Sequence, residues 1–206
     1  NFFGLLEDAS QAAEIAHKVG AKLIMAVDPI AQAITRTAAE TFRTRRGNCL
    51  SFCNMFVAMA REVGLEVYYQ EVDVPPDWSL RADAFVLNRH LNVVVDLGQA
   101  GEQVVDFNIA DFRSSYDRRR ITDGRALAHV YNNLAVERLG AREPAAAFAY
   151  LRRALTECDP GFSPAWTTLG ILHLRGGRPD HAEAAFLRAL EVDPHDEVAM
   201  SNLAGL

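Results

Sequence analysis

The last third of the sequence repeats itself, and this repetition limits the fold of that region more than any other feature. Residues 131–135 (YNNLA) match residues 166–170 (WTTLG) at an offset of 35, and a further copy begins with residues 200–204 (MSNLA). A unit of this length with helical periodicity is a pair of helices that cannot bury its own apolar face, so copies must stack on one another. We therefore predict an all-α module over residues 125–206, with two copies and a truncated third.

The second copy contains Trp166, Leu169, Gly170, Ala182, Phe186, Ala189 and Pro194. At these positions it resembles a tetratricopeptide repeat, a family that uses them to pack its two helices against each other. The resemblance implies binding of a peptide or protein segment on a concave face. So few repeats could instead cap the preceding domain, and partner binding is favoured only if further repeats follow. Because the chain starts with Asn and stops inside a copy, we expect it to be a piece of a longer protein.

A cysteine stands at the start of a segment that predicts a buried helix. Asn48 is a suitable N-cap, residues 49–60 contain only two polar side chains, and Gly64 ends the segment. A helix that is apolar almost all round belongs in the centre of a domain. The unpaired N–H groups at a helix start favour a thiolate, which makes Cys49 a candidate nucleophile. The alternative is a core residue, since free cysteine is often buried.

The periodicity then changes from helical to extended. Strands are predicted over residues 65–72, 84–87, 90–96 and 103–107. Helices are predicted before the cysteine, over residues 8–18 and 28–46. Residues 113–124 (RSSYDRRRITDG) are polar and are interpreted as a solvated linker. The segment before the repeats therefore predicts an α+β domain.

A hairpin between two of these strands brings a histidine and an aspartate together. A turn centred near Gln99 pairs residues whose numbers sum to about 198, so Asp106 lies opposite Asn92. His90 shares a face with Asn92, and Asp106 is its diagonal neighbour, within side-chain reach. We therefore predict a catalytic triad in which Cys49 is the nucleophile, His90 the base and Asp106 the group that orients the base.

Residues 47–107 contain Gly47-x-Cys49, a helix through Ala58–Arg61 with a Gly64-Leu65 ending, a strand with Tyr68, then His90 and Val105–Phe107. This combination shows a resemblance to the transglutaminase-like superfamily, a branch of the papain-like cysteine enzymes. It implies a papain-like domain over residues 1–120 and thiol chemistry on an amide or peptide bond. Water would resolve the acyl-enzyme in a peptidase or amidase, and an amine would do so in a cross-linking acyl transferase. The fusion also looks like a bacterial arrangement, often exported or in the envelope, although a cytoplasmic protein fits too.

One departure from the papain-like pattern leaves a different class of function open. Those enzymes usually supply a side-chain oxyanion donor ahead of the cysteine, and the ten residues before Cys49 contain no Gln. Losing one such donor costs about 100- to 1000-fold in rate. An inactive scaffold that binds proteins through its repeats is therefore the alternative. Residues that could line a cleft around the triad are Asn48, Tyr68, Gln70, Trp78, Asn92 and Asn108.

Composition argues against several other classes. The net charge is −6, with 21 basic and 27 acidic residues, so there is no basic excess for a nucleic-acid partner. Three cysteines without framework spacing do not predict a disulfide scaffold. Cys49-x-x-x-Cys53 lacks a second ligand pair for zinc, and we expect neither a metal nor a cofactor. The apolar stretches are too short to span a membrane.

Overall fold

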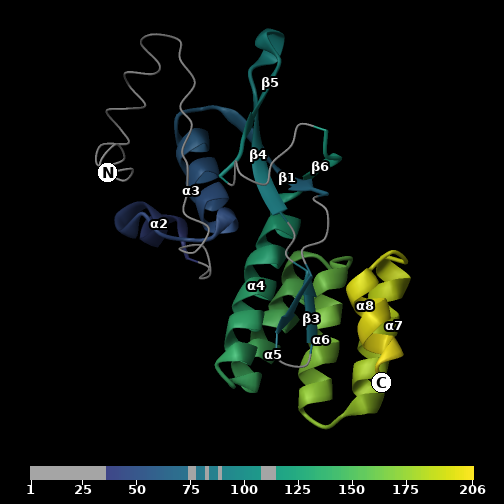
Figure 1. Ribbon diagram of the computed structural model, residues 1–206. Helices are drawn as coiled ribbons and strands as arrows, with labels where there is room; N and C mark the ends of the chain where they lie inside the picture. The colour runs from purple at the N-terminus through teal and green to yellow at the C-terminus, as the bar shows by residue number, and fades with distance from the viewer. Residues whose placement is uncertain (1–35, 74–77, 82–83, 88–89, 108–114) are drawn as a thin grey trace.

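The structure, a computed structural model, describes residues 36–73, 78–81, 84–87, 90–107 and 115–206 (Figure 1). Its first part holds helices α2 (Ala38–Thr44) and α3 (Cys49–Glu62) and a four-stranded antiparallel sheet in the order β5-β4-β1-β6. The strands are β1 (Glu66–Val72), β4 (His90–Asp96), β5 (Glu102–Val105) and β6 (Arg118–Ile121), with a short 3₁₀ turn η3 (Gly98–Ala100) before β5. A separate hairpin of β2 (Trp78–Arg81) and β3 (Ala84–Leu87) lies against the last helix of the chain.

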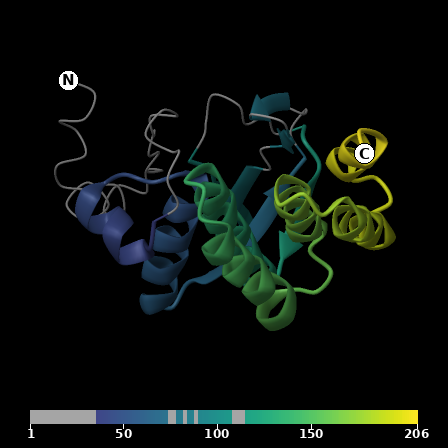
Figure 2. The same cartoon turned by 90° about the horizontal axis from the view of Figure 1, so that it is seen from below.

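The second part is all helical. It contains α4 (Asp123–Gly140), α5 (Pro144–Arg153) with a π-helical last turn η4 (Ala154–Cys158), α6 (Ser163–Arg175), α7 (Pro179–Val192) and α8 (Glu197–Ala204). Figure 2 shows the structure from below, with the helices of this part packed side by side, from α4 in green to α8 in yellow. The predicted fold class, an α+β domain followed by a helical repeat, is confirmed.

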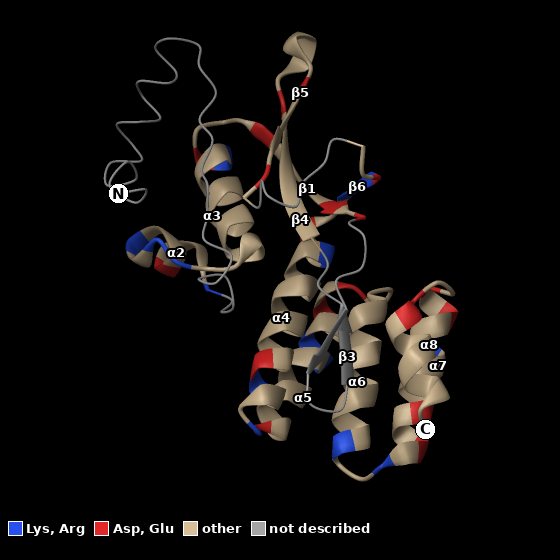
Figure 3. Cartoon of the chain, viewed as in Figure 1, with Lys and Arg blue, Asp and Glu red and all other residues tan. Residues whose placement is uncertain are grey.

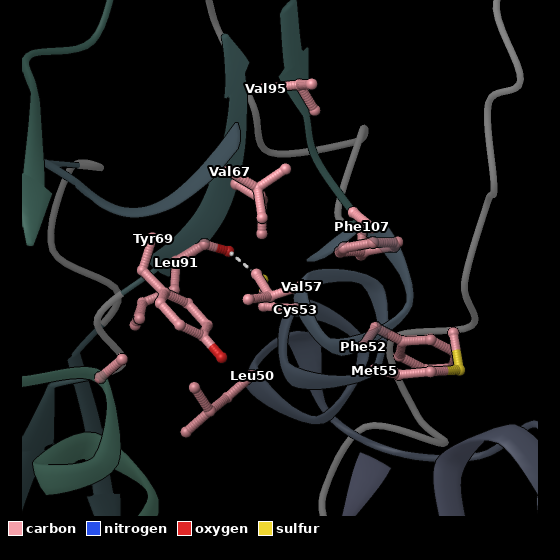
Figure 4. Packing of buried hydrophobic residues seen from close by; sticks show 13 residues of the cluster. Leu50, Phe52, Cys53, Met55, Val57, Val67, Tyr69, Leu91, Val95 and Phe107 are labelled. Carbon is pink, nitrogen blue, oxygen red and sulfur yellow. Dashed lines mark hydrogen bonds between the residues drawn. The ribbon is translucent and has the colours of Figure 1, made fainter. Parts of the chain in front are cut away.

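Helix α3 packs on the sheet and forms the core of the first part. The Asn48 side chain caps it by accepting a hydrogen bond from the Ser51 N–H at 2.9 Å. The helix ends before Gly64, whose φ of +80° favours glycine. The buried cluster joins α3 to β1 and β4 (Figure 4) and includes Leu50, Phe52, Cys53, Val57, Val67, Tyr69, Leu91, Val93 and Phe107. The helix predicted from Cys49 is therefore confirmed.

The helix predicted over residues 28–46 is wrong in its extent. Within the described residues it starts only at Ala38, because Thr37 is extended and forms a capping box with Glu40. It ends at Thr44, before Arg45 in the left-handed conformation. The helix predicted over residues 8–18 lies outside the described residues.

The β4–β5 hairpin has the predicted register. Val93 pairs with Val105 and Val95 with Gln103, so paired numbers sum to 198. On its other side, β4 pairs with β1, which sets Val72 opposite His90. The sheet thus places His90 at the start of β4, next to the end of β5.

The linker predicted over residues 113–124 is wrong in part, because it contains edge strand β6. Residues 118–121 pair with β1, with Tyr69 opposite Ile121. Two arginines of this strand pair with acidic side chains: Arg119 with Glu71, and Arg120 with Glu102. Charged side chains are tolerated on an edge strand, so the polar composition concealed the strand.

The repeat helices pack through small residues. A Cβ on Gly170 of α6 would lie 2.4 Å from the Phe186 ring of α7, so only glycine lets the two helices approach this closely. Trp166 donates from its indole N–H to the Pro160 carbonyl at 3.0 Å.

No helix of the described residues is long and apolar enough to cross a membrane.

Candidate active site

Cys49 is the first residue of α3, and its position is fixed by close packing around the helix start. The thiol-bearing residue is partly exposed. The hydroxyl of the buried Ser51 donates to Asn48 Oδ1 at 2.8 Å and accepts from the Arg36 N–H at 2.7 Å. A Cβ on Gly47 would lie 2.6 Å from Ser51 Cβ, so a residue without a side chain is needed here. These contacts therefore hold Cys49 in place at the start of α3.

His90 and Asp106 form a buried ion-pair geometry beside Cys49. His90 Nε2 lies 2.7 Å from Asp106 Oδ2 and 2.9 Å from Oδ1. Only 7 % of the His90 side chain and 6 % of the Asp106 side chain are exposed. The Cys49 thiol lies close enough to His90 to raise the pKa of its imidazolium. Since Asp106 occupies Nε2, Nδ1 is the ring nitrogen that remains for the thiol.

These contacts change the acidity of His90. Burial by itself lowers the pKa of an imidazolium, because it disfavours the charged form. Hydrogen bonds and charge interactions with Asp106 and Cys49 outweigh burial and raise the pKa of His90 to about 9. The arrangement therefore favours a protonated His90 at neutral pH.

The other two cysteines lie in settings unlike that of Cys49. Cys53, one turn further along α3, is fully buried in the core (Figure 4) and donates to the Leu91 carbonyl at 3.5 Å. Burial raises the pKa of the Cys53 thiol well above its usual range. Burial also raises the pKa of Cys158, at the end of η4. Both thiols are therefore expected to react slowly near neutral pH.

Two of the predicted cleft residues are buried instead of lining an open surface. Asn92 is fully buried, and its Nδ2 donates to Asp106 Oδ2 at 2.9 Å. Gln70, directly opposite on β1, is buried as well. The sequence placed Asn92 on the face of His90 but gave no sign that this face is covered.

The remaining cleft predictions have different outcomes. Asn48 caps α3, and Tyr68 is half-buried with the Arg120 guanidinium 4.4 Å from its ring centre. The backbone of Trp78 lies in β2, while its side chain falls outside the description. Asn108 lies outside the described residues. Contacts of Tyr68, Trp78 or Asn108 with the triad therefore stay a prediction.

A second buried polar cluster, which the sequence did not predict, joins the sheet to the repeats. Glu71 of β1 is 8 % exposed, accepts from Arg125 Nε at 2.6 Å and lies 2.8 Å from His129 Nε2, both on α4. Arg119 of β6 binds the same carboxylate, and Figure 3 shows acidic β1 residues (red) next to basic β6 residues (blue). Arg125 also binds Asp159 of the repeat at 3.0 Å. This cluster, the Glu71 junction, ties the two parts of the chain together.

The geometry suits thiol chemistry carried by the protein's own side chains. Within the described ranges, no three or more His, Cys, Asp or Glu residues are grouped to hold a metal ion. Cys49 is partly exposed, whereas His90 and Asp106 are buried and hydrogen-bonded to each other. Such an arrangement can hold a thiolate, give a proton to a leaving group and take one back from water.

Comparison with known proteins agrees with both resemblances. Residues 4–101 match the family model of the transglutaminase-like superfamily, and residues 138–205 match that of the tetratricopeptide repeat. The first match includes Cys49 and His90, and Asp106 lies just beyond its end. No curated protein matches the chain. The chain therefore joins a transglutaminase-like domain, which has a cysteine-enzyme fold, to tetratricopeptide repeats.

Proposed function

We propose that the protein is a cysteine-dependent hydrolase that acts on an amide or peptide bond of a peptide or protein. The single observation that carries this proposal is the setting of His90, whose Nε2 lies 2.7 Å from Asp106 Oδ2 and whose pKa is raised by both Asp106 and Cys49. A buried histidine held between a carboxylate and a thiol is the arrangement that activates a cysteine nucleophile.

The reaction follows from the roles of these three side chains. The Cys49 thiolate attacks the carbonyl carbon, and the backbone N–H of Cys49 can donate to the developing oxyanion. The His90 imidazolium gives its proton to the leaving amine, which leaves a thioester on Cys49. His90, now neutral, takes a proton from water as the water attacks the thioester, and the acid product leaves. Asp106 keeps the imidazole oriented.

We further propose a division of labour between residues 1–120 and residues 125–206. The first segment would carry the chemistry. Tetratricopeptide repeats are protein-interaction modules with extended binding surfaces, so the second segment would recruit the substrate or a partner protein. The Glu71 junction supports this view, because it holds the two segments in a defined arrangement.

An activated ester tests the proposal without knowledge of the natural substrate. We expect p-nitrophenyl acetate to give a burst of nitrophenol and an acetyl group on Cys49, seen by mass spectrometry of the intact protein and its peptides. Cys49→Ala should lose the burst, and His90→Ala should reduce it strongly. An acetylation pattern that is unchanged by both substitutions would contradict the proposal and favour an inactive scaffold.

The second half of the reaction separates hydrolysis from acyl transfer. Adding a primary amine, such as glycinamide, should leave the rate of deacylation nearly unchanged if water is the natural acceptor. If the amine accelerates deacylation and the amide product accumulates, the protein is a cross-linking acyl transferase and the hydrolase assignment is wrong. The same Cys49 acyl-enzyme serves both outcomes, so the triad is tested independently of the acceptor.

A further inference from the structure

Asn92 contacts Asp106 of the candidate triad. Among the contacts that the structure describes, none joins Asn92 to the sulfur of Cys49. Its Nδ2 donates to Asp106 Oδ2 at 2.9 Å, and the same oxygen lies 2.7 Å from His90 Nε2. Oδ2 therefore accepts from two donors that the same strand, β4, holds two residues apart. A carboxylate fixed by two such donors cannot rotate away from the histidine without losing both bonds.

The burial of Asn92 is costly and needs a reason. The side chain is completely buried in a strand whose next three residues are valines. Burying an amide without full compensation destabilises the folded state, and Asn92 Oδ1 has no partner in the described part of the chain. A valine or leucine would avoid this cost. An apolar residue at this position could not form the bond to Asp106.

We propose that Asn92 is a positioning residue, which acts on the reaction by fixing the Asp106 carboxylate that orients His90. This inference rests on the proposed function, because it assigns Asn92 a task only if the triad activates Cys49. The order of action is Asn92, then Asp106, then His90, and finally the thiol. Asn92 exchanges no proton in this scheme.

The test measures the alkylation rate of Cys49 by iodoacetamide, with mass-spectrometric readout for each cysteine. In Asn92→Leu, which keeps the size but removes the donor, we expect the rate at pH 6 to fall about tenfold. In an Asp106→Ala background, the same substitution should have no further effect, because its target is gone. Asn202→Leu is the matched control. Asn202 is also buried, but its Nδ2 donates to the Val198 carbonyl at 2.8 Å in α8.

Asn92→Asp gives a second readout, which would not change if Asn92 had only a structural role. Two carboxylates at this distance cannot both ionise easily, so one keeps a proton at acidic pH and donates it to the other. Reactivity should then be close to that of the wild type at low pH and should fall as this proton is lost. Neither the wild type nor Asn92→Leu should show this additional step in the pH profile. This variant also serves as the test if Asn92→Leu does not fold.

The outcomes separate this inference from the proposed function. If wild-type Cys49 is no more reactive than Cys53, both fail. If wild-type Cys49 is reactive and His90→Ala abolishes the reactivity, the proposed function stands. The inference about Asn92 alone is overturned if, in that case, Asn92→Leu lowers stability as Asn202→Leu does but leaves the alkylation rate of Cys49 unchanged.

Discussion

Replacing Glu71 with glutamine should destabilise the protein strongly, because it removes a buried charge that faces two arginines and a histidine. Arg119 is 66 % exposed, so its pair with Glu71 contributes little. Arg125, 19 % exposed, and the buried His129 are the partners that matter. Removing one member of a buried pair typically costs about 3–5 kcal/mol. Taking the lower end, about 3 kcal/mol, the melting temperature should fall by about 6–12 °C for a chain of this length.

The same carboxylate should make stability depend on acid pH. Burial raises the pKa of Glu71, but hydrogen bonds from His129 and Arg125 outweigh burial and hold the pKa far below its usual value. A depressed pKa contributes stability above the unfolded value of 4.5, and this contribution is lost as the pH falls below it. The wild type should therefore lose stability below pH 4.5 more steeply than Glu71→Gln.

Calorimetry of wild type, Glu71→Gln and Glu102→Gln measures both effects. Glu102 also pairs with an arginine, Arg120, but at the surface, and removing such a pair should cost no more than about 1 kcal/mol. Equal melting temperatures for the two variants would contradict a stabilising role of the buried Glu71 charge. An acid sensitivity of Glu71→Gln equal to that of the wild type would also contradict it.

Three further changes test other parts of the structure. Because the pKa of His90 is raised to about 9, its stabilising contribution is fully present below pH 6.5 and is lost as the pH rises through 9. The free energies of unfolding in urea at pH 6 and pH 9 should therefore differ less in His90→Ala than in the wild type. Gly47→Ala should cost about 1–3 kcal/mol in urea unfolding, because its Cβ has no room at the start of α3; a change below 0.5 kcal/mol, about the spread of neutral surface substitutions, would contradict this packing. Gly170→Ala should lower the free energy of unfolding by about 1–3 kcal/mol, because the new Cβ clashes with Phe186. In the control Gly140→Ala, the new Cβ meets no atom within 4 Å, so this change should be neutral or stabilising. Equal melting temperatures for these two variants would argue against the close approach of α6 and α7.

Local patterns in the sequence were sufficient for the parts of the fold whose causes are local. Asn48 before an apolar run predicted the start of α3, and the cap hydrogen bond to Ser51 supplies the reason. The alternation on either side of the turn near Gln99 predicted the register of β4 and β5. From that register, Asp106 was predicted to lie within reach of His90.

Other features depend on contacts between residues far apart in the sequence, which no local pattern contains. Strand β6 has an edge-strand composition dominated by arginine, and its partners are on β1, about fifty residues earlier. The Glu71 junction joins β1 to α4 across a similar separation. The burial of Asn92 likewise depends on what covers the sheet. Periodicity reports which residues share a face, but it does not report whether a polar face is covered.

The measurement that tests the account most directly is the alkylation of the three cysteines by iodoacetamide as a function of pH, in the wild type and in His90→Ala. Burial raises the pKa values of Cys53 and Cys158, so these thiols provide slow internal references. We predict that Cys49 reacts about tenfold faster than either reference, or more, at pH 6, and that His90→Ala removes the difference. Equal rates for all three cysteines in the wild type would contradict the central claim that His90 and Asp106 activate Cys49.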